Sequence, residues 1–159
     1  SEEGFPPFEV GATELSPEER ETMRQQLSRE NFGFERVEIL KGNIGYFKLN
    51  YFALAEESAP VYEAAFNYVA RTDALIIDLR GNGGSMDANA IPLFLSYLFE
   101  KPTHTVSLYW RPSNKTDDYY TKATVPGKRY LGKSVYVLTS GGTFSGAEEF
   151  AYDLQNLKR

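Results

Sequence analysis

Two short apolar runs, ALIIDL (74–79) and SVYVLT (134–139), each lead into a glycine-rich loop and then into a segment with helical character. Continuous apolar runs of this length are typical of strands that are covered on both faces of a sheet. The strand–helix–strand–helix alternation therefore predicts an α/β fold with a mainly parallel sheet. Loops at the carboxyl ends of neighbouring parallel strands open on the same edge, so we expect any site to lie there.

The segments before these runs predict a helix followed by a hairpin. The tetrapeptide SPEE (16–19) has the serine, proline and glutamate of a capping box, and the helix that it starts is expected to end near Arg29. The stretch FERVEILKGNIGYFKL (34–49) then alternates on both sides of Gly42 and Asn43. This pattern predicts two strands joined by a tight turn.

Four further segments complete the expected fold. SAPVYEAAFNYVA (58–70) has the apolar spacing of a helix, and a second helix is expected over 87–99 despite Pro92. HTVSLYW (104–110) is expected to be a strand, and 111–133 is expected to be a long polar excursion. The chain then enters the second apolar run and a final helix.

The composition argues against several classes of function. A net charge of −5 makes nucleic acid an unsuitable partner, because phosphate binding needs a basic face. The absence of cysteine rules out disulfides, thiolate metal sites and a cysteine nucleophile. His104 is the single histidine, so a metal site would depend on carboxylates alone, and we expect neither a metal nor a cofactor. No apolar run reaches the roughly 18 residues of a membrane span.

The two glycine-rich loops, DLRGNGGS (78–85) and TSGGTFSGAEE (139–149), do not match the usual phosphate-binding patterns. A P-loop needs a lysine followed by serine or threonine after its last glycine, and neither loop has that pair. The dinucleotide pattern fails because Met86 occupies the position of its third glycine. Nucleotide binding is therefore not favoured.

The second loop offers two interpretations of Ser145. A serine at a tight strand-to-helix turn exposes its hydroxyl, and the N–H of Gly146, together with an N–H from the first loop, would hold an oxyanion beside it. The pattern departs from the G-x-S-x-G elbow because Thr143 stands at the first glycine. Alternatively, SGAE is a capping box in which Ser145 and Glu148 bond reciprocally. Taken locally, the sequence puts capping ahead of catalysis.

A nucleophilic serine also needs a base, and the chain offers no convincing one. His104 is the only conventional candidate at neutral pH, but it starts a predicted strand, where a partly exposed structural histidine is expected. We therefore do not assign the role of base to His104. Asp78, at the end of the first apolar run, is expected to anchor its loop rather than to act as an acid.

Four stretches together resemble one family: NFGFERVEILKGNIGYFKL, TDALIIDLRGNGG, YWRPSNKTDDYYT and VPGKRYLGKSVYVLTSGGTFSGAEEFAYDLQNLKR. They are similar to the tail-specific (C-terminal processing) serine peptidases, in the branch that contains the interphotoreceptor retinoid-binding protein repeats and tricorn-protease core domains. The resemblance extends from about Asn31 to Arg159. The pairing of DLRGNGG with TSGGTFSGAEEFA is its most specific part.

The resemblance implies both a fold and a site. The fold would be a ClpP/crotonase-like ββα spiral with a mainly parallel sheet, preceded by a β-hairpin and an N-terminal helix. The family's nucleophile matches Ser145. Its oxyanion donors match Gly146 in the second loop and Gly83 or Gly84 in the first.

The chain departs from the family where the base should be. The processing branch uses a Ser–Lys dyad with the lysine well downstream, whereas only Lys158 follows Ser145 here. Other members use a histidine in an upstream D-x-H segment and a carboxylate after a downstream GET-like strand, and neither is present. We therefore expect a fragment that is incomplete at both ends and inactive alone, with a linker and N-terminal helix at 1–33 and a partial catalytic core at 34–159.

The resulting prediction is a serine peptidase that hydrolyses peptide bonds through an acyl-enzyme on Ser145. The resemblance implies a peptide or unfolded protein as substrate and a place outside the cytoplasm. One alternative is a non-catalytic module that binds a hydrophobic small molecule, for which eleven Tyr and eleven Phe would supply a lining. A crotonase-like acyl-CoA enzyme is a weaker alternative, because no basic patch for the CoA phosphates accompanies the loops.

Overall fold

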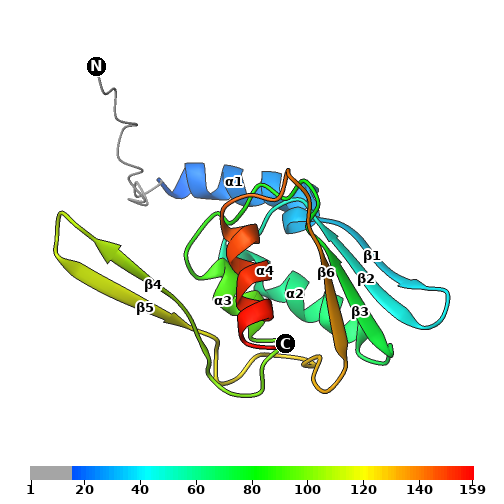
Figure 1. The fold of residues 1–159 in the computed structure, drawn as a ribbon. Coiled ribbons are helices and arrows are strands. Elements are labelled where there is room, and N and C mark those ends of the chain that lie inside the picture. Colours follow the sequence, from blue (N-terminus) through cyan, green and yellow to red (C-terminus); the bar gives the residue numbers. More distant parts are fainter. Residues whose placement is uncertain (1–15) are drawn as a thin grey trace.

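The computed structural model describes residues 16–159 and has a mixed α/β fold, shown in Figure 1. The predicted linker before Ser16 lies outside the described residues. The strands are β1 (Phe34–Leu40), β2 (Ile44–Leu49), β3 (Ala74–Asp78), β4 (His104–Trp110), β5 (Lys115–Tyr120) and β6 (Ser134–Leu138). The helices are α1 (Pro17–Arg29), the 3₁₀ turn η1 (Asn31–Gly33), α2 (Ala55–Val69), α3 (Ala90–Leu95) and α4 (Gly146–Asn156).

The main sheet has the strand order β1-β2-β3-β6. β1 pairs antiparallel with β2, whereas β2, β3 and β6 run parallel to one another. The β1–β2 turn contains Gly42 and Asn43, both with positive φ, as the tight hairpin turn requires. The predictions of a mainly parallel sheet, a hairpin and an N-terminal helix are therefore confirmed.

Helix α1 begins as its sequence predicts. The Ser16 N–H donates to Glu19 Oε2 at 2.8 Å, and the Glu19 N–H donates to Ser16 Oγ at 3.2 Å, which closes the capping box. The helix ends at Arg29, the residue expected. None of the helices within residues 16–159 has the length and apolar character that crossing a membrane requires.

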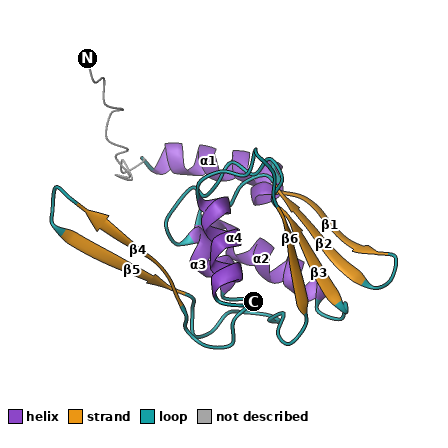
Figure 2. Ribbon diagram, in the orientation of Figure 1, coloured by secondary structure: helices purple, strands orange, loops and turns teal. Residues whose placement is uncertain are grey.

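Helices α2, α3 and α4 lie on one side of the main sheet, and the hydrophobic core fills the space between them (Figure 2). Phe94 of α3 is fully buried at the centre of this core. Its ring contacts six other aromatic rings at centroid distances of 5.0–6.4 Å. These rings belong to Phe34, Phe47, Phe52, Tyr62, Phe66 and Phe150. Through Phe150 the core fixes α4, the helix that follows the second glycine-rich loop.

Two local expectations are wrong. The helix predicted over 87–99 spans only Ala90–Leu95. Before it, Asp87 accepts hydrogen bonds from the N–H groups of Ala55 and Asn89, and after it the N–H groups of Tyr97 and Leu98 donate to carbonyls three residues back, as in turns. The polar excursion contains a strand, β5, which pairs antiparallel with β4 in a separate hairpin. Figure 1 shows this hairpin extending away from the main sheet.

The second apolar run forms an edge strand rather than a strand covered on both faces. Within residues 16–159, β6 pairs with β3 alone, and its side chains are exposed or half-buried. β3 lies between two neighbours and is more deeply buried. The difference arises from position in the sheet, which an apolar run does not reveal.

Candidate functional site

The two glycine-rich loops meet at the carboxyl ends of β3 and β6, as predicted for neighbouring parallel strands. The Phe144 N–H of the second loop donates to the Asn82 carbonyl of the first at 3.0 Å. The loops also touch at Gly84, where an added Cβ would lie only 2.9 Å from Ser145 Cβ and 3.2 Å from Gly146 N. The main chain of one loop therefore packs directly on that of the other.

Ser145 has a backbone conformation that serine rarely adopts. Its φ of 53° and ψ of −124° place an L-residue in a region that favours glycine, at a cost of roughly 1–3 kcal/mol. The side chain is exposed at the start of α4. A strained, exposed serine at a strand-to-helix turn is the geometry of a nucleophile elbow.

Ser145 also occupies the cap position of α4. Its N–H donates to Glu148 Oε2 at 2.8 Å, as in a capping box, and its carbonyl accepts the N–H of Glu148 at 2.9 Å. Ser16, which caps α1, does so with an ordinary φ of −56°. Capping alone therefore does not require the positive φ of Ser145, so the two interpretations of this residue are compatible.

The expected oxyanion donors of the first loop already have acceptors. The N–H of Gly83 donates to the carbonyl of Asn50, and that of Gly84 donates to Asn82 Oδ1, both at 2.9 Å. The Asn82 amide is fully buried and also donates from Nδ2 to the Leu49 carbonyl at 3.0 Å. Asn82 thus connects the end of β2 to the first loop, a role that its sequence context did not indicate.

Among the backbone N–H groups that lack an acceptor in the described chain, two lie where Gly146 packs against the first loop. Within residues 16–159, those of Gly146 and Ser85 take part in no hydrogen bond. They lie close together, because a Cβ added to Gly146 would be 3.1 Å from Ser85 N. The oxyanion roles expected of Gly146, Gly83 and Gly84 stay predictions, and of these three N–H groups that of Gly146 is the one without an acceptor within residues 16–159.

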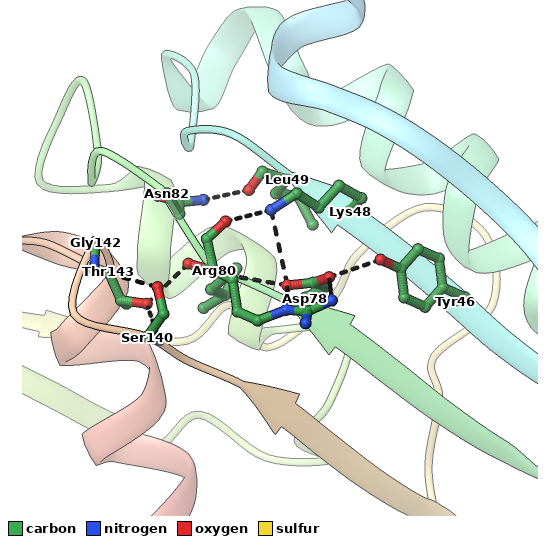
Figure 3. A network of polar contacts seen from close by, with 10 residues as sticks. Tyr46, Lys48, Leu49, Asp78, Arg80, Asn82, Ser140, Gly142 and Thr143 are labelled. Atoms are coloured by element: carbon green, nitrogen blue, oxygen red, sulfur yellow. Dashed lines mark hydrogen bonds and ion pairs between the residues drawn. The ribbon is translucent and has the colours of Figure 1, made fainter.

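Asp78 anchors the first loop, as expected. The Asp78 side chain is only 2% exposed. Its carboxylate accepts hydrogen bonds from Arg80 Nε at 3.0 Å, from Arg80 Nη2 at 2.7 Å and from the Tyr46 hydroxyl at 2.7 Å (Figure 3). Lys48 Nζ lies 3.7 Å from Asp78 Oδ1 and donates a hydrogen bond to the Arg80 carbonyl. The Arg80 guanidinium is the main cause that holds the pKa of Asp78 well below its usual range. Asp78 is therefore suited to anchor the loop as a carboxylate rather than to donate a proton.

His104 lies in a polar cluster of its own on the β4–β5 hairpin. Its Nε2 is 2.9 Å from Ser107 Oγ, which donates to Asp118 Oδ1 at 2.6 Å. Because the single hydroxyl proton points to Asp118, the His104 Nε2–H donates to Ser107. Within residues 16–159, no histidine or lysine is hydrogen-bonded to Ser145.

Two carboxylates of α4 lie one helical turn apart and are sheltered from solvent. Asp153 is buried, and its Oδ2 has no hydrogen-bond partner among the described residues. Burial raises the pKa of Asp153 to about 6, against an opposing influence of His104. Burial and the neighbouring Asp153 raise the pKa of Glu149 to about 7.

These pKa values predict that the folded chain loses stability as the pH rises. Both lie above the values of an unfolded chain, so the contribution to stability is complete below about pH 4 and is lost as the pH rises through about 6 to 7. We expect the loss to be roughly 1–2 kcal/mol, and Asp153→Asn to remove more than half of it. Urea unfolding across this range measures the effect, with the exposed Glu35→Gln as the matched control. An unchanged pH dependence in Asp153→Asn would contradict the prediction.

The fold is shared with several solved structures. A candidate peptidase from Parabacteroides merdae matches with a TM-score of 0.59 and 17% identity over 84% of this chain and 45% of its own. The photosystem II D1 C-terminal processing protease matches with a TM-score of 0.56 and 21% identity, over 76% of this chain and 31% of its own. A lipoprotein from Streptococcus agalactiae matches with a TM-score of 0.52 and 16% identity, over 83% of this chain and 50% of its own.

The chain thus spans between a third and a half of the length of these proteins. Its sequence agrees with a family model described as peptidase family S41 over residues 43–159, which is more than half of the chain. The matched region includes both glycine-rich loops and Ser145. The chain belongs to peptidase family S41.

Proposed function

We propose that the full-length protein is a serine peptidase in which Ser145 is the nucleophile. The observation that carries the proposal is the strained backbone of Ser145 at the start of α4, pressed against Gly84 and followed by the free N–H of Gly146. Membership of family S41 supports the same reaction class. Hydrolysis then proceeds by acyl transfer to the serine and from there to water.

In the first step the Ser145 oxygen bonds to the substrate's carbonyl carbon, and its proton passes to a base. We place this base outside residues 1–159. The C–N bond then breaks, the amine leaves with that proton, and an ester on Ser145 remains. Water attacks the ester, which releases the carboxylic acid and restores the hydroxyl. A base is needed in both halves of the reaction, so we expect residues 1–159 alone to be inactive.

The developing oxyanion would be held by backbone N–H groups from both loops. Gly146 supplies one from the second loop. From the first loop, the free N–H of Ser85 is available as the structure stands, while that of Gly84 would become available if the Asn82 side chain turned away. The N–H of Gly83 is held by a main-chain carbonyl and is the least available of the three.

We further propose a peptide or unfolded protein as the substrate. A shallow groove runs along α4 from the second glycine-rich loop and is lined mainly by polar and small side chains, among them Ser140 and Glu148. Glu148 is the residue whose Oε2 accepts the Ser145 N–H. An open groove of this kind suits an extended chain better than a compact small molecule. The likeness to a lipoprotein supports a place outside the cytoplasm, as the family resemblance implies.

The alternative of a module that binds a hydrophobic small molecule has less support. Seven of the aromatic residues that could have lined its pocket, Phe94 and the six rings around it, pack against one another and are buried. They fill the core rather than surround a space. The shallow cavities found over residues 16–159 are open to solvent rather than enclosed by this aromatic cluster.

A fluorophosphonate probe tests the proposed function. In the full-length protein we expect the probe to label Ser145, and Ser145→Ala to abolish both the labelling and the hydrolysis of an unfolded protein such as casein, because the attacking oxygen is gone. Mass spectrometry of the labelled peptide identifies the modified residue.

Ser107→Ala is the matched control, because Ser107 is the serine next to the only histidine of the chain. This variant should keep both labelling and hydrolysis. A wild-type protein that is neither labelled nor active on peptides would overturn the proposal. Labelling of Ser107 in place of Ser145 would also do so.

A further inference from the structure

Thr143, two residues before Ser145, is buried between the two glycine-rich loops with 8% of its surface exposed. Its Oγ1 donates to the Leu79 carbonyl of the first loop at 2.9 Å. The same oxygen accepts the N–H of Ser140 at 2.9 Å, and the Thr143 N–H donates to the Ser140 carbonyl at 3.0 Å. The Thr143 hydroxyl thus donates a hydrogen bond to the first loop and accepts one within the second loop.

Few bonds join the loops, so this hydroxyl has no obvious substitute. Between residues 78–85 and 139–149, the structure contains one side-chain bond, from Thr143, and one main-chain bond, from Phe144 to Asn82. They fix two consecutive residues, and Ser145 follows immediately. A positive φ on serine persists only where the surroundings determine it. Glu148 holds the Ser145 N–H from within α4, and these two bonds are the constraints that tie the residues just before Ser145 to the first loop.

We propose that Thr143 is a positioning residue, whose hydroxyl holds Ser145 in its reactive backbone conformation above the first glycine-rich loop. The inference rests on the proposed function, since it assigns a role in the reactivity of Ser145. It also explains why threonine stands where an ordinary nucleophile elbow has glycine. Here the loop is fixed by a side chain that glycine lacks.

The test compares Thr143→Val with Thr143→Ser in the full-length protein. Valine has nearly the shape of threonine but no hydroxyl, so the Ser140 N–H loses its partner and the Leu79 carbonyl keeps only the N–H of Asn82 within its own loop. Serine keeps the hydroxyl and loses only a methyl group. We expect Thr143→Val to lower the maximal rate of fluorophosphonate labelling, and kcat for a peptide, by about tenfold or more with little change in KM. Thr143→Ser should restore most of both.

Melting temperatures establish that each variant is folded, and amide hydrogen exchange in the wild type gives an independent measurement. The Ser140 amide, bonded to Thr143 Oγ1, should exchange slowly, whereas that of Gly141, which has no partner in the described chain, should exchange fast. Equal exchange of these two amides would overturn the inference even if Thr143→Val failed to fold.

The outcomes separate this inference from the proposed function. If the wild type is labelled at Ser145 and folded Thr143→Val reacts as fast, Ser145 is a nucleophile that Thr143 does not position. If Thr143→Ser is as slow as Thr143→Val, the methyl group matters and the hydroxyl does not, which also overturns the inference. If the wild type is not labelled, the proposed function fails, and the positioning role fails with it.

Discussion

Replacing Gly84 with alanine is expected to lower the rate of fluorophosphonate labelling of Ser145 by about 100-fold or more, since displacements near 1 Å at a reacting group have effects of that size. An added Cβ would lie 2.9 Å from Ser145 Cβ, 3.1 Å from the Phe144 carbonyl oxygen and 3.2 Å from Gly146 N. The last two are main-chain atoms that no rotamer change can move. The second loop must therefore shift, and the nucleophile and its oxyanion donor shift with it.

Alanine substitutions at the other two glycines of the same loop distinguish the effect of this clash from the effect of backbone strain. Gly81 has a positive φ of 78° but nothing within 4 Å of an added Cβ. Gly81→Ala should therefore cost only the conformational strain, about 1–2 kcal/mol. Gly83 lacks a positive φ, and its nearest neighbour would be the Asn50 carbonyl oxygen at 4.0 Å, so Gly83→Ala should be close to neutral.

Labelling rates and urea unfolding of the three variants, made in the full-length protein, give the comparison. We expect labelling to be slow in Gly84→Ala alone, while stability falls in both Gly84→Ala and Gly81→Ala. If Gly81→Ala slowed labelling as much as Gly84→Ala, flexibility of the first loop would be the cause rather than contact with Ser145. Unchanged labelling in Gly84→Ala would place the reactive serine elsewhere.

The mainly parallel sheet and the hairpin could be predicted because the signals are local and strong. An apolar run followed by a glycine-rich loop and a helix defines each parallel unit, and a turn with two positive φ values defines the hairpin. The capping box at Ser16 fixed the start of α1. In each case a few adjacent residues carry the information.

The elements that were missed depend on contacts outside their own segments. β5 has the sequence KTDDYY, which lacks apolar alternation, and it is a strand that pairs with β4. α3 begins only at Ala90, after Asp87, whose carboxylate bonds to the N–H of Ala55, far away in the sequence. β6 has an apolar sequence but an edge position. Periodicity cannot report such pairings.

The same division applies to the candidate site. The sequence placed Ser145, Gly146 and both loops on one edge of the sheet, because each follows a parallel strand. It did not indicate that Asn82 would occupy the N–H of Gly84, or that Thr143 would bridge to Leu79. Both depend on the packing of two loops about sixty residues apart. The substitution of threonine for glycine at 143 was the one available signal, and it was noted only as a departure from a pattern.

Phe94→Ala is expected to have the largest effect on stability, a loss of about 3–5 kcal/mol in the free energy of unfolding. Phe94 is fully buried, and the six rings around it come from the sheet, from α2 and from α4. Residues held from several sides cannot close around a cavity, so most of the lost contact remains lost. Since domains have only about 5–15 kcal/mol in total, this is a large share.

Phe144→Ala is the matched control for this substitution, because it removes the same side chain from a position that is 67% exposed. Its free energy of unfolding should change by less than about 0.5 kcal/mol. Urea unfolding of both variants, followed by circular dichroism, makes the comparison. Because Phe94 also contacts Phe150 of α4, labelling of Ser145 should slow in Phe94→Ala at temperatures where the protein is still folded. Equal stability of the two variants would mean that the aromatic cluster does not carry the fold, and that α4 is held in place by the loops alone.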